Sequence, residues 1–319
     1  MAVIPTAPLG PRGVAVTRIG LGCGPFGNLF TAMSDDDAVA TVAAAWSAGV
    51  RYFDAAPLYG HGLAEHRLGR ALQEYPRDEF VVSSKVGRLL RADADFDPGI
   101  FRVERGLAPR FDYTRDGVLR SIEESLQRLG LDRLDVALVH DPDHHEREAL
   151  DGAFPALVEL RDQGVVRAIG AGMNQHEMLG RFVANVDLDC VLLAGRYTLL
   201  DRSGEALLET CAARGVGVIL GGVFNSGVLA SVDVQRTYDY EPASAGVVER
   251  ARALRAVCEG HGVVLPAAAL RFVFEHPAVS TVVVGARTPD EIRADAEWAQ
   301  TALPAGLREE LAVLTSSGR

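Results

Sequence analysis

The stretch that decides the fold is Gly49-Val50-Arg51-Tyr52-Phe53-Asp54-Ala55-Ala56-Pro57-Leu58-Tyr59-Gly60. A glycine ends a helical segment, a short apolar strand follows at 51–54, and the strand ends on a carboxylate. Glycine is common where a helix closes in the left-handed conformation. The order of helix, glycine, strand and polar exit predicts one unit of a parallel α/β fold. Glycines in the same place before later strands are Gly130, Gly164 and Gly215.

This unit recurs along the chain. Apolar runs predict strands at 19–22, 51–54, 80–85, 136–140, 166–172, 189–193, 216–220 and 281–284. Helical periodicity lies between them, at 34–48, 63–75, 114–129, 153–162, 176–184, 204–214, 245–261 and 289–298. Eight alternating units predict a (β/α)8 TIM barrel. A turn at 10–13 predicts an N-terminal β-hairpin of residues 8–9 against 14–16.

A doubly wound open sheet is the alternative fold. Its dinucleotide loop requires a glycine spacing that Gly20-Leu21-Gly22-Cys23-Gly24 does not have. No repeat or linker divides the chain, so we expect a single domain over residues 1–319. The segments 88–113 and 223–242 exceed ordinary connections and predict functional loops after strands three and seven.

Composition and charge limit the possible classes of protein. The 319 residues are 48% hydrophobic and 24% charged, as in ordinary soluble globular proteins. The net charge of −11 argues against a nucleic-acid partner, which needs a clustered cationic surface. We therefore expect a small-molecule substrate, and the sequence leaves the oligomeric state open.

The location of the protein is predicted from its N-terminus and its cysteines. The first residues lack the cationic and apolar regions of a signal peptide. The longest apolar stretch, 263–274, carries Pro266 and Arg271 and is too short to span a bilayer. The 4 cysteines have no metal-ligand spacing and are typical of reduced core thiols. We expect a cytoplasmic protein without a membrane partner.

Four reactive side chains end or follow predicted strands. Asp54 ends the second strand, Lys85 the third and His140 the fourth, and Tyr59 follows Asp54 by five residues. In a barrel of this kind the C-terminal strand ends carry the reactive groups. Any one of them alone is as easily a surface residue at a strand exit. Their occurrence together on adjacent strands predicts a catalytic group.

These side chains fit the needs of reversible carbonyl reduction. The reaction requires a group that exchanges a proton with the substrate oxygen, and a free tyrosine has a pKa of about 10. An ammonium in reach lowers that pKa, and a carboxylate holds the ammonium. We expect Lys85 to lower the pKa of Tyr59, Asp54 to hold Lys85, and His140 to orient the same substrate oxygen.

The stretch from Gly49 to Gly60 resembles the signature of the aldo-keto reductase family. Residues 126–135, running into His140, are similar to the family's approach to its histidine, and residues 164–170 resemble its fifth strand, which ends at Asn174. Such matches extend from about residue 14 to 298. The resemblance implies a barrel, a catalytic tetrad of Asp54, Tyr59, Lys85 and His140, and hydride transfer with a nicotinamide cofactor and no metal.

The resemblance also implies a cofactor site. Asn174 would hold the nicotinamide carboxamide, and the segment after strand eight would hold the adenosine end. The implied cofactor residues are Gly22, Asn174, Gly221, Phe224, Asn225, Gly227, Gly285, Arg287, Glu291 and Asp295. NADP-dependent members carry a lysine and an arginine where this chain has Gly285 and Glu291. We therefore expect NAD, while Arg287 leaves NADP possible.

Two departures from the family pattern narrow the subgroup. Met173 replaces the serine before the amide-binding asparagine, and Gly221 replaces the aromatic residue that stacks under the nicotinamide. Phe224 is either a substitute contact or a loop anchor. These features are similar to the subgroup of D-threo-aldose (L-fucose), L-galactose and pyridoxal 4-dehydrogenases. They imply oxidation of a ring hemiacetal to its lactone, with Tyr59 as acid and base.

Three other functions stay open. The first is a general aldehyde or ketone reductase that uses NADPH. The second is a metal-dependent hydrolase, suggested by His140, Asp141, Asp143, His144 and His145. Because no other predicted strand ends in histidine or cysteine, we expect no metal. The third is a noncatalytic subunit, against which the intact tetrad argues.

Overall fold

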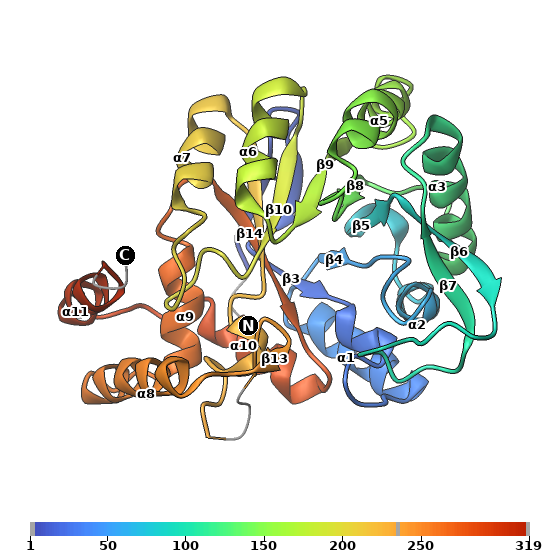
Figure 1. Ribbon diagram of the computed structural model, residues 1–319. Helices are drawn as coiled ribbons and strands as arrows, with labels where there is room; N and C mark the ends of the chain where they lie inside the picture. The colour runs from blue at the N-terminus through green and yellow to red at the C-terminus, as the bar shows by residue number, and fades with distance from the viewer. Residues whose placement is uncertain (1–3, 234–236, 317–319) are drawn as a thin grey trace.

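The computed structural model describes residues 4–233 and 237–316. Its centre is a closed barrel of parallel strands in the order β10-β11-β14-β3-β4-β5-β8-β9 (Figure 1). These strands are β3 (Ile19–Gly22), β4 (Tyr52–Asp54), β5 (Val81–Val86), β8 (Val136–His140), β9 (Ala168–Met173), β10 (Cys190–Ala194), β11 (Gly217–Gly221) and β14 (Val279–Gly285). The predicted (β/α)8 barrel is confirmed, and each predicted barrel strand overlaps an observed one.

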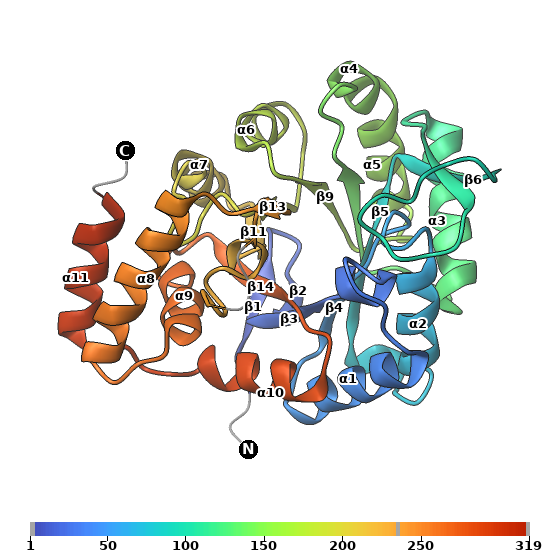
Figure 2. The same ribbon diagram turned by 60° about the horizontal axis from the view of Figure 1, so that its bottom comes forward.

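Helices surround the strands (Figure 2). They are α1 (Asp35–Ser47), α2 (Leu63–Leu72), α3 (Arg115–Leu129), α4 (Glu146–Glu148), α5 (Phe154–Asp162), α6 (His176–Asn185), α7 (Glu205–Arg214), α8 (Ala245–Gly260), α9 (Leu265–Val273), α10 (Pro289–Trp298) and α11 (Ala305–Ser316). The side chains of Ser34, Thr114 and Thr288 cap the N-termini of α1, α3 and α10. The left-handed Gly130 and Gly215 end α3 and α7, as predicted.

Three of these helices, the short α4 and the longer α9 and α11, were not predicted. α9 occupies the apolar run after strand seven, and almost all of its side chains are buried. This run follows α8 after only four residues, so it was interpreted as an apolar stretch and not as a separate helix. α9 packs between α8 and α10, and α11 packs against α8. Of the described helices, none is long and apolar enough alone to cross a membrane, and α8 and α9 meet that test only as a pair bent by 96°.

Three hairpins lie outside the barrel ladder. The predicted N-terminal hairpin is confirmed as β1 (Thr6–Leu9) and β2 (Val14–Thr17), with Leu9 opposite Val14. The predicted loop at 88–113 contains a second hairpin, β6 (Arg88–Asp93) with β7 (Gly106–Phe111). The segment 223–242 contains a third, β12 (Thr237–Tyr238) with β13 (Glu241–Pro242), and its residues 234–236 lie outside the described part. The prediction of functional loops did not include these hairpins. β6 and β7 are joined by the long connection 94–105, and the two-residue turn of Asp239 and Tyr240 lacks the glycine that usually marks such a turn.

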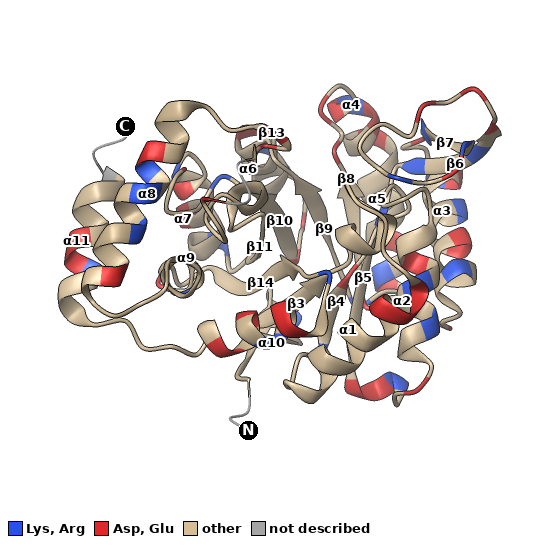
Figure 3. Cartoon of the chain, turned by 90° about the horizontal axis from the view of Figure 1, so that it is seen from below, with Lys and Arg blue, Asp and Glu red and all other residues tan. Residues whose placement is uncertain are grey.

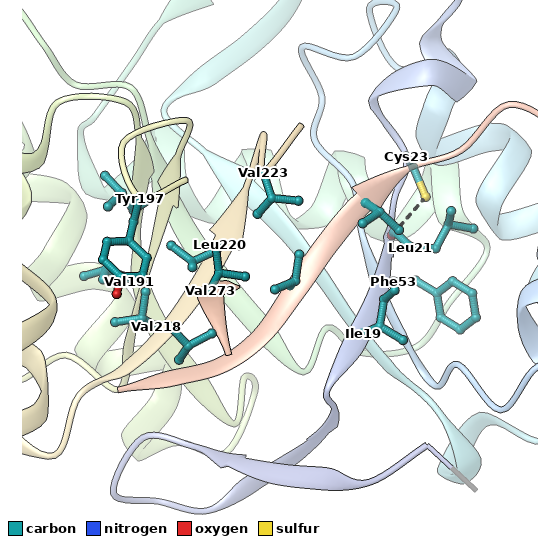
Figure 4. Packing of buried hydrophobic residues seen from close by; sticks show 14 of the residues in the cluster. Ile19, Leu21, Cys23, Phe53, Val191, Tyr197, Val218, Leu220, Val223 and Val273 are labelled. Carbon is teal, nitrogen blue, oxygen red and sulfur yellow. Dashed lines mark hydrogen bonds between the residues drawn. The ribbon is translucent and has the colours of Figure 1, made fainter. Parts of the chain in front are cut away.

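Strand alternation divides the core into two layers. On β8, Val136 and Leu138 belong to the cluster inside the barrel, whereas Ala137 and Val139 pack toward the helices. Figure 4 shows part of the outer layer, where Leu21 of β3 lies near Phe53 of β4. Charged residues gather on the helices, the connecting segments and the β6–β7 hairpin, and the barrel strands carry few (Figure 3). A charged residue on a barrel strand is therefore a candidate functional residue.

Candidate functional site

The predicted reactive side chains reach the mouth of the barrel through strand alternation. His140 comes two residues after Leu138, which faces the barrel interior. Asp54 comes two residues after Tyr52, which also lies in the interior cluster. Lys85 follows Val81 of that cluster by four residues on β5. Because a strand repeats its direction every second residue, all three face inward at the C-terminal end.

Asp54 and Lys85 form a buried ion pair. Lys85 Nζ donates to Asp54 Oδ2 at 2.7 Å and to the Ala55 carbonyl oxygen at 2.8 Å. Ser83 Oγ donates to the other carboxylate oxygen, Oδ1, at 2.7 Å. The hydroxyl of Tyr52 lies 2.9 Å from Ser83 Oγ. With both carboxylate oxygens and the ammonium engaged, the pair is held in one geometry. Ser83 and Tyr52 were not singled out from the sequence, since serine and tyrosine in a strand carry no specific signal.

Tyr59 lies beside this pair because two chain segments cross closely. Lys85 Nζ is 4.8 Å from the centroid of the Tyr59 ring. A Cβ on Gly27 would lie 2.4 Å from the carbonyl carbon of Tyr59, and one on Gly60 would lie 2.5 Å from Gly27 Cα. Only glycine permits such an approach. The crossing of Gly27 and Gly60 therefore fixes the backbone that carries Tyr59.

The protonation states of the pair and the tyrosine are coupled. Burial raises the pKa of Tyr59, and the Lys85 ammonium opposes this by a smaller amount. Burial lowers the pKa of Lys85, but the charges of Asp54 and Tyr59 outweigh it and raise that pKa overall. Lys85 lowers the pKa of Tyr59 as expected, but burial outweighs this effect, and the sequence does not give the depth of burial. At neutral pH a protonated tyrosine lies beside an ammonium.

His140 completes the group as a neutral imidazole. Its ring lies 6.0 Å from the Tyr59 ring at an interplanar angle of 88°. Burial lowers the pKa of His140 well below its ordinary value, and the charges of Lys85 and Arg88 act in the same direction. The hydroxyl of Tyr113 donates to the His140 carbonyl oxygen at 2.7 Å. Tyr113 thus holds the backbone of His140, a role that the sequence did not reveal.

The opposite half of the mouth is lined by glycine. Gly22, Gly285 and Gly221 end the strands β3, β14 and β11, which are neighbours in the barrel. Gly285 and Gly221 each come two residues after an inward-facing side chain, Val283 and Ile219. No side chain from these three strand ends enters the mouth. This half of the mouth therefore presents main chain where the reactive half presents Asp54, Lys85 and His140.

Two asparagines border that room. Asn174 follows β9 and donates from Nδ2 to the Ala194 carbonyl oxygen at 3.1 Å. Asn225 is 2% exposed and donates to the Gly195 carbonyl oxygen at 3.3 Å. Its Oδ1 is buried and has no partner within residues 4–233 and 237–316. A buried amide oxygen without a donor is uncommon in proteins and fits a site that receives a ligand's donor.

The other residues predicted after β11 lie in the same turn. Phe224 is partly buried and packs against the outer core, which favours its being a loop anchor. Gly227 has φ of 107° and ends the short 3-10 turn η4 (Asn225–Gly227). Asn225, Phe224 and Gly227 are therefore adjacent in space as well as in sequence.

The segment after β14 presents carboxylates. The guanidinium of Arg287 donates to the carbonyl oxygens of Leu29, Thr31 and Ala32 at 3.1, 2.9 and 3.0 Å. Glu291 Oε2 accepts from the Arg287 backbone N–H at 2.6 Å. Asp295 is 5% exposed, and burial raises its pKa to about 7. The hydrogen bonds of Arg287 thus hold the segment 29–32, which follows β3.

The histidine-rich segment after β8 is not arranged as a metal centre. Within the described ranges, no group of three or more His, Cys, Asp or Glu side chains is placed to hold a metal ion. The ring of His145 instead lies 4.7 Å from that of Phe111 and 5.4 Å from that of Tyr113. His145 therefore packs on the β6–β7 hairpin.

Comparisons with known proteins extend over nearly the whole chain. A family model described as the aldo/keto reductase family matches residues 18–307. The chain is 45% identical over 310 residues to a D-threo-aldose 1-dehydrogenase of a Pseudomonas species, with 94% of each chain covered. It is 40% identical over 319 residues to a pyridoxal 4-dehydrogenase of Microbacterium luteolum, with 93% of each covered. The solved structure of an aldo-keto reductase from Bacillus halodurans, in its holo form, has a TM-score of 0.78 at 22% identity. The match covers 98% of this chain and 96% of that one, and it supports the barrel fold.

Proposed function

The chain belongs to the aldo/keto reductase family, and we propose that it is an NAD-dependent dehydrogenase that oxidises a cyclic hemiacetal to its lactone. The resemblance stated from the sequence is confirmed. The relatives named D-threo-aldose 1-dehydrogenase and pyridoxal 4-dehydrogenase support the ring form of an aldose, or of pyridoxal, as the substrate. The observation that carries the proposal is the buried Asp54–Lys85 pair beside Tyr59 at the barrel mouth.

Tyr59 is the group that moves the proton. Oxidation removes a proton from the hemiacetal hydroxyl and a hydride from the carbon that carries it. The chemistry supplied by a bound nicotinamide is acceptance of that hydride. The Tyr59 phenolate takes the hydroxyl proton in oxidation, and the phenol returns it in reduction. Lys85 stabilises the phenolate, Asp54 holds Lys85, and neutral His140 donates to the substrate oxygen and orients it.

The residues opposite the tetrad fit a nicotinamide dinucleotide. Asn174 would hold the carboxamide. Asn225 Oδ1, which has no partner among the described residues, would accept a hydrogen bond from the cofactor. At the ends of β3, β11 and β14, Gly22, Gly221 and Gly285 would let the cofactor approach the main chain, since they carry no side chains.

The segment after β14 favours NAD over NADP. Glu291 is a carboxylate that would accept hydrogen bonds from the ribose hydroxyls of NAD and repel the 2′-phosphate of NADP. Arg287 is already engaged with three carbonyl oxygens, which weakens the case for NADP. The four buried free cysteines support a reducing compartment, and we place the enzyme in the cytoplasm with a small-molecule substrate.

One assay tests the function. NADH formation is followed at alkaline pH with L-fucose, D-arabinose, L-galactose and pyridoxal, each with NAD and with NADP. Alkaline pH favours oxidation because burial raises the pKa of Tyr59. We expect turnover with at least one of these hemiacetals and NAD. Turnover confined to the reduction of open-chain aldehydes with NADPH would replace the proposal with the general reductase.

A further inference from the structure

A strained residue lies next to the catalytic histidine. Asp141 follows His140 at the end of β8 and has φ of 40°, in the left-handed region that non-glycine residues rarely adopt. In a regular strand its side chain would point opposite to that of His140. Instead, Asp141 Oδ2 lies 3.4 Å from His140 Nε2. The unusual backbone thus turns the carboxylate toward the reactive side of the mouth.

Several contacts hold Asp141 in this conformation. Its backbone N–H donates to the Gly172 carbonyl oxygen at 3.0 Å, and its own carbonyl oxygen accepts from the Tyr113 hydroxyl at 3.1 Å. Arg88 Nη2 donates to Asp141 Oδ2 at 2.8 Å. The Arg88 guanidinium carbon lies 5.0 Å from the centroid of the Phe111 ring, so the hairpin fixes the guanidinium. Strain that surrounding contacts maintain at a site indicates a functional use.

The carboxylate keeps one oxygen free. Its Oδ2 is engaged by Arg88 and lies close to His140, whereas its Oδ1 has no partner in the described part of the chain. The Asp141 side chain is 27% exposed, so Oδ1 is open to a ligand. A carboxylate oxygen is an acceptor only, and its ligand must be a donor such as a hydroxyl.

We propose that Asp141, held by Arg88, binds the hydroxyl on the carbon next to the reacting carbon, and so selects hemiacetals that carry this hydroxyl. The inference rests on the proposed function. The reacting oxygen lies between Tyr59 and His140 in that mechanism, and the neighbouring hydroxyl of a sugar is about one hydrogen-bond length from it. Asp141 Oδ2 lies 3.4 Å from His140 Nε2, so the carboxylate is close enough to this oxygen for its other oxygen to accept from the neighbouring hydroxyl. Asp141 is a specificity-determining residue and takes no proton in the reaction.

The test compares the best aldose substrate with its 2-deoxy counterpart. In the wild type, kcat/KM should be roughly tenfold to a hundredfold higher for the aldose, because the deoxy sugar leaves a carboxylate oxygen unpaired. Asp141→Ala should lower kcat/KM for the aldose by a similar factor and change that for the deoxy sugar by no more than about threefold. Asp141→Asn retains an acceptor and should give an intermediate ratio. The exposed Asp143, two residues away, provides the control, since Asp143→Ala should keep the wild-type ratio.

The possible outcomes distinguish a failure of the role proposed for Asp141 from a failure of the proposed function. A wild type that oxidises no hemiacetal would overturn the proposed function. A wild type that oxidises the aldose and the deoxy sugar equally well would overturn the role of Asp141 alone. Oxidation of pyridoxal but of no aldose would do the same, because the carbon next to the reacting carbon of pyridoxal carries no hydroxyl. Equal losses for both sugars in Asp141→Ala would also overturn it, because they would mean that Asp141 only supports His140. Thermal unfolding and NADH fluorescence check that each variant is folded. If Asp141→Ala does not fold, the ratio measured for Asp141→Asn decides the test.

Discussion

Replacing Tyr59 with phenylalanine removes one oxygen atom and leaves the ring beside Lys85. The proton-transfer group is lost while the packing is kept. We expect kcat to fall by about two to four orders of magnitude. NADH binding, measured by fluorescence titration, should stay close to that of the wild type. Near-native turnover in Tyr59→Phe would mean that another group moves the proton.

Lys85→Met tests the electrostatic role of the ammonium. Lys85 lowers the pKa of Tyr59 against the larger effect of burial. Without it that pKa rises further, so the phenolate forms only at higher pH. The pH profile of kcat for oxidation should therefore shift to the alkaline side, at a much lower maximum. An unshifted profile would show that Lys85 acts only by packing.

Glu291→Arg tests the choice of cofactor. We expect the wild type to prefer NAD in kcat/KM by roughly tenfold to a hundredfold, equivalent to about one to three kcal/mol. An arginine at this position offers a cation to the 2′-phosphate and removes a negative charge. The variant should narrow or reverse the preference. Equal efficiency with both cofactors in the wild type would contradict the role assigned to Glu291.

At the scale of elements, the crossing of the segments after β3 and β4 positions Tyr59. In Gly27→Ala the new Cβ would lie 2.4 Å from the Tyr59 carbonyl carbon, so one backbone must move. We expect a stability loss of roughly 1–3 kcal/mol, typical of overpacking, together with a fall in kcat. The matched control is Gly180→Ala in α6, where a Cβ meets nothing within 4 Å. Denaturant unfolding should show the control to be about 0.5–1 kcal/mol more stable than the wild type.

The elements also show what a sequence can and cannot predict here. Apolar runs and glycine caps located the barrel strands, and alternation then places Asp54, Lys85 and His140 inward without further information. The β6–β7 hairpin was not foreseen, since its strands pair across a long excursion. The roles of Asp141 and Tyr113 were missed for another reason. They depend on one left-handed backbone angle and on one hydroxyl that reaches a carbonyl oxygen, and neither leaves a pattern in the chain.

At the scale of the whole molecule, one end of the barrel carries the reactive group and the other end joins the N-terminal hairpin to the barrel. The reactive group lies at the C-terminal end of the strands, whereas the β1–β2 hairpin lies near the start of β10. There Arg12 donates to Asp189 at 2.8 Å and to Asp187 at 2.7 Å, and Arg161 donates to Asp189 at 3.0 Å. Asp189 is fully buried. This network joins the hairpin to the barrel.

Arg12→Met tests whether the N-terminal end of the barrel contributes to stability and not to catalysis. Because Arg12 is partly exposed and Arg161 still pairs with Asp189, we expect a loss of only about 1 kcal/mol in unfolding free energy. The values of kcat and KM should stay within about twofold of the wild type, because the geometry of the active site does not depend on the N-terminal end of the barrel. A large change in kcat with little change in stability would contradict the division between the two ends.

The β6–β7 hairpin pairs its strands with each other, from Arg88 opposite Phe111 to Asp93 opposite Gly106, and takes no part in the barrel ladder. Outside the hairpin, the connection between these strands bonds to the segment after β3, where Phe30 donates to the Ile100 carbonyl oxygen, and not to the barrel strands. The hairpin can therefore be exchanged by recombination without opening the parent sheet. Arg88, which holds Asp141, stands at the base of that segment. Inheritance of a different hairpin would therefore bring a different partner for Asp141 and change the accepted sugars while Asp54, Lys85 and Tyr59 stay as they are.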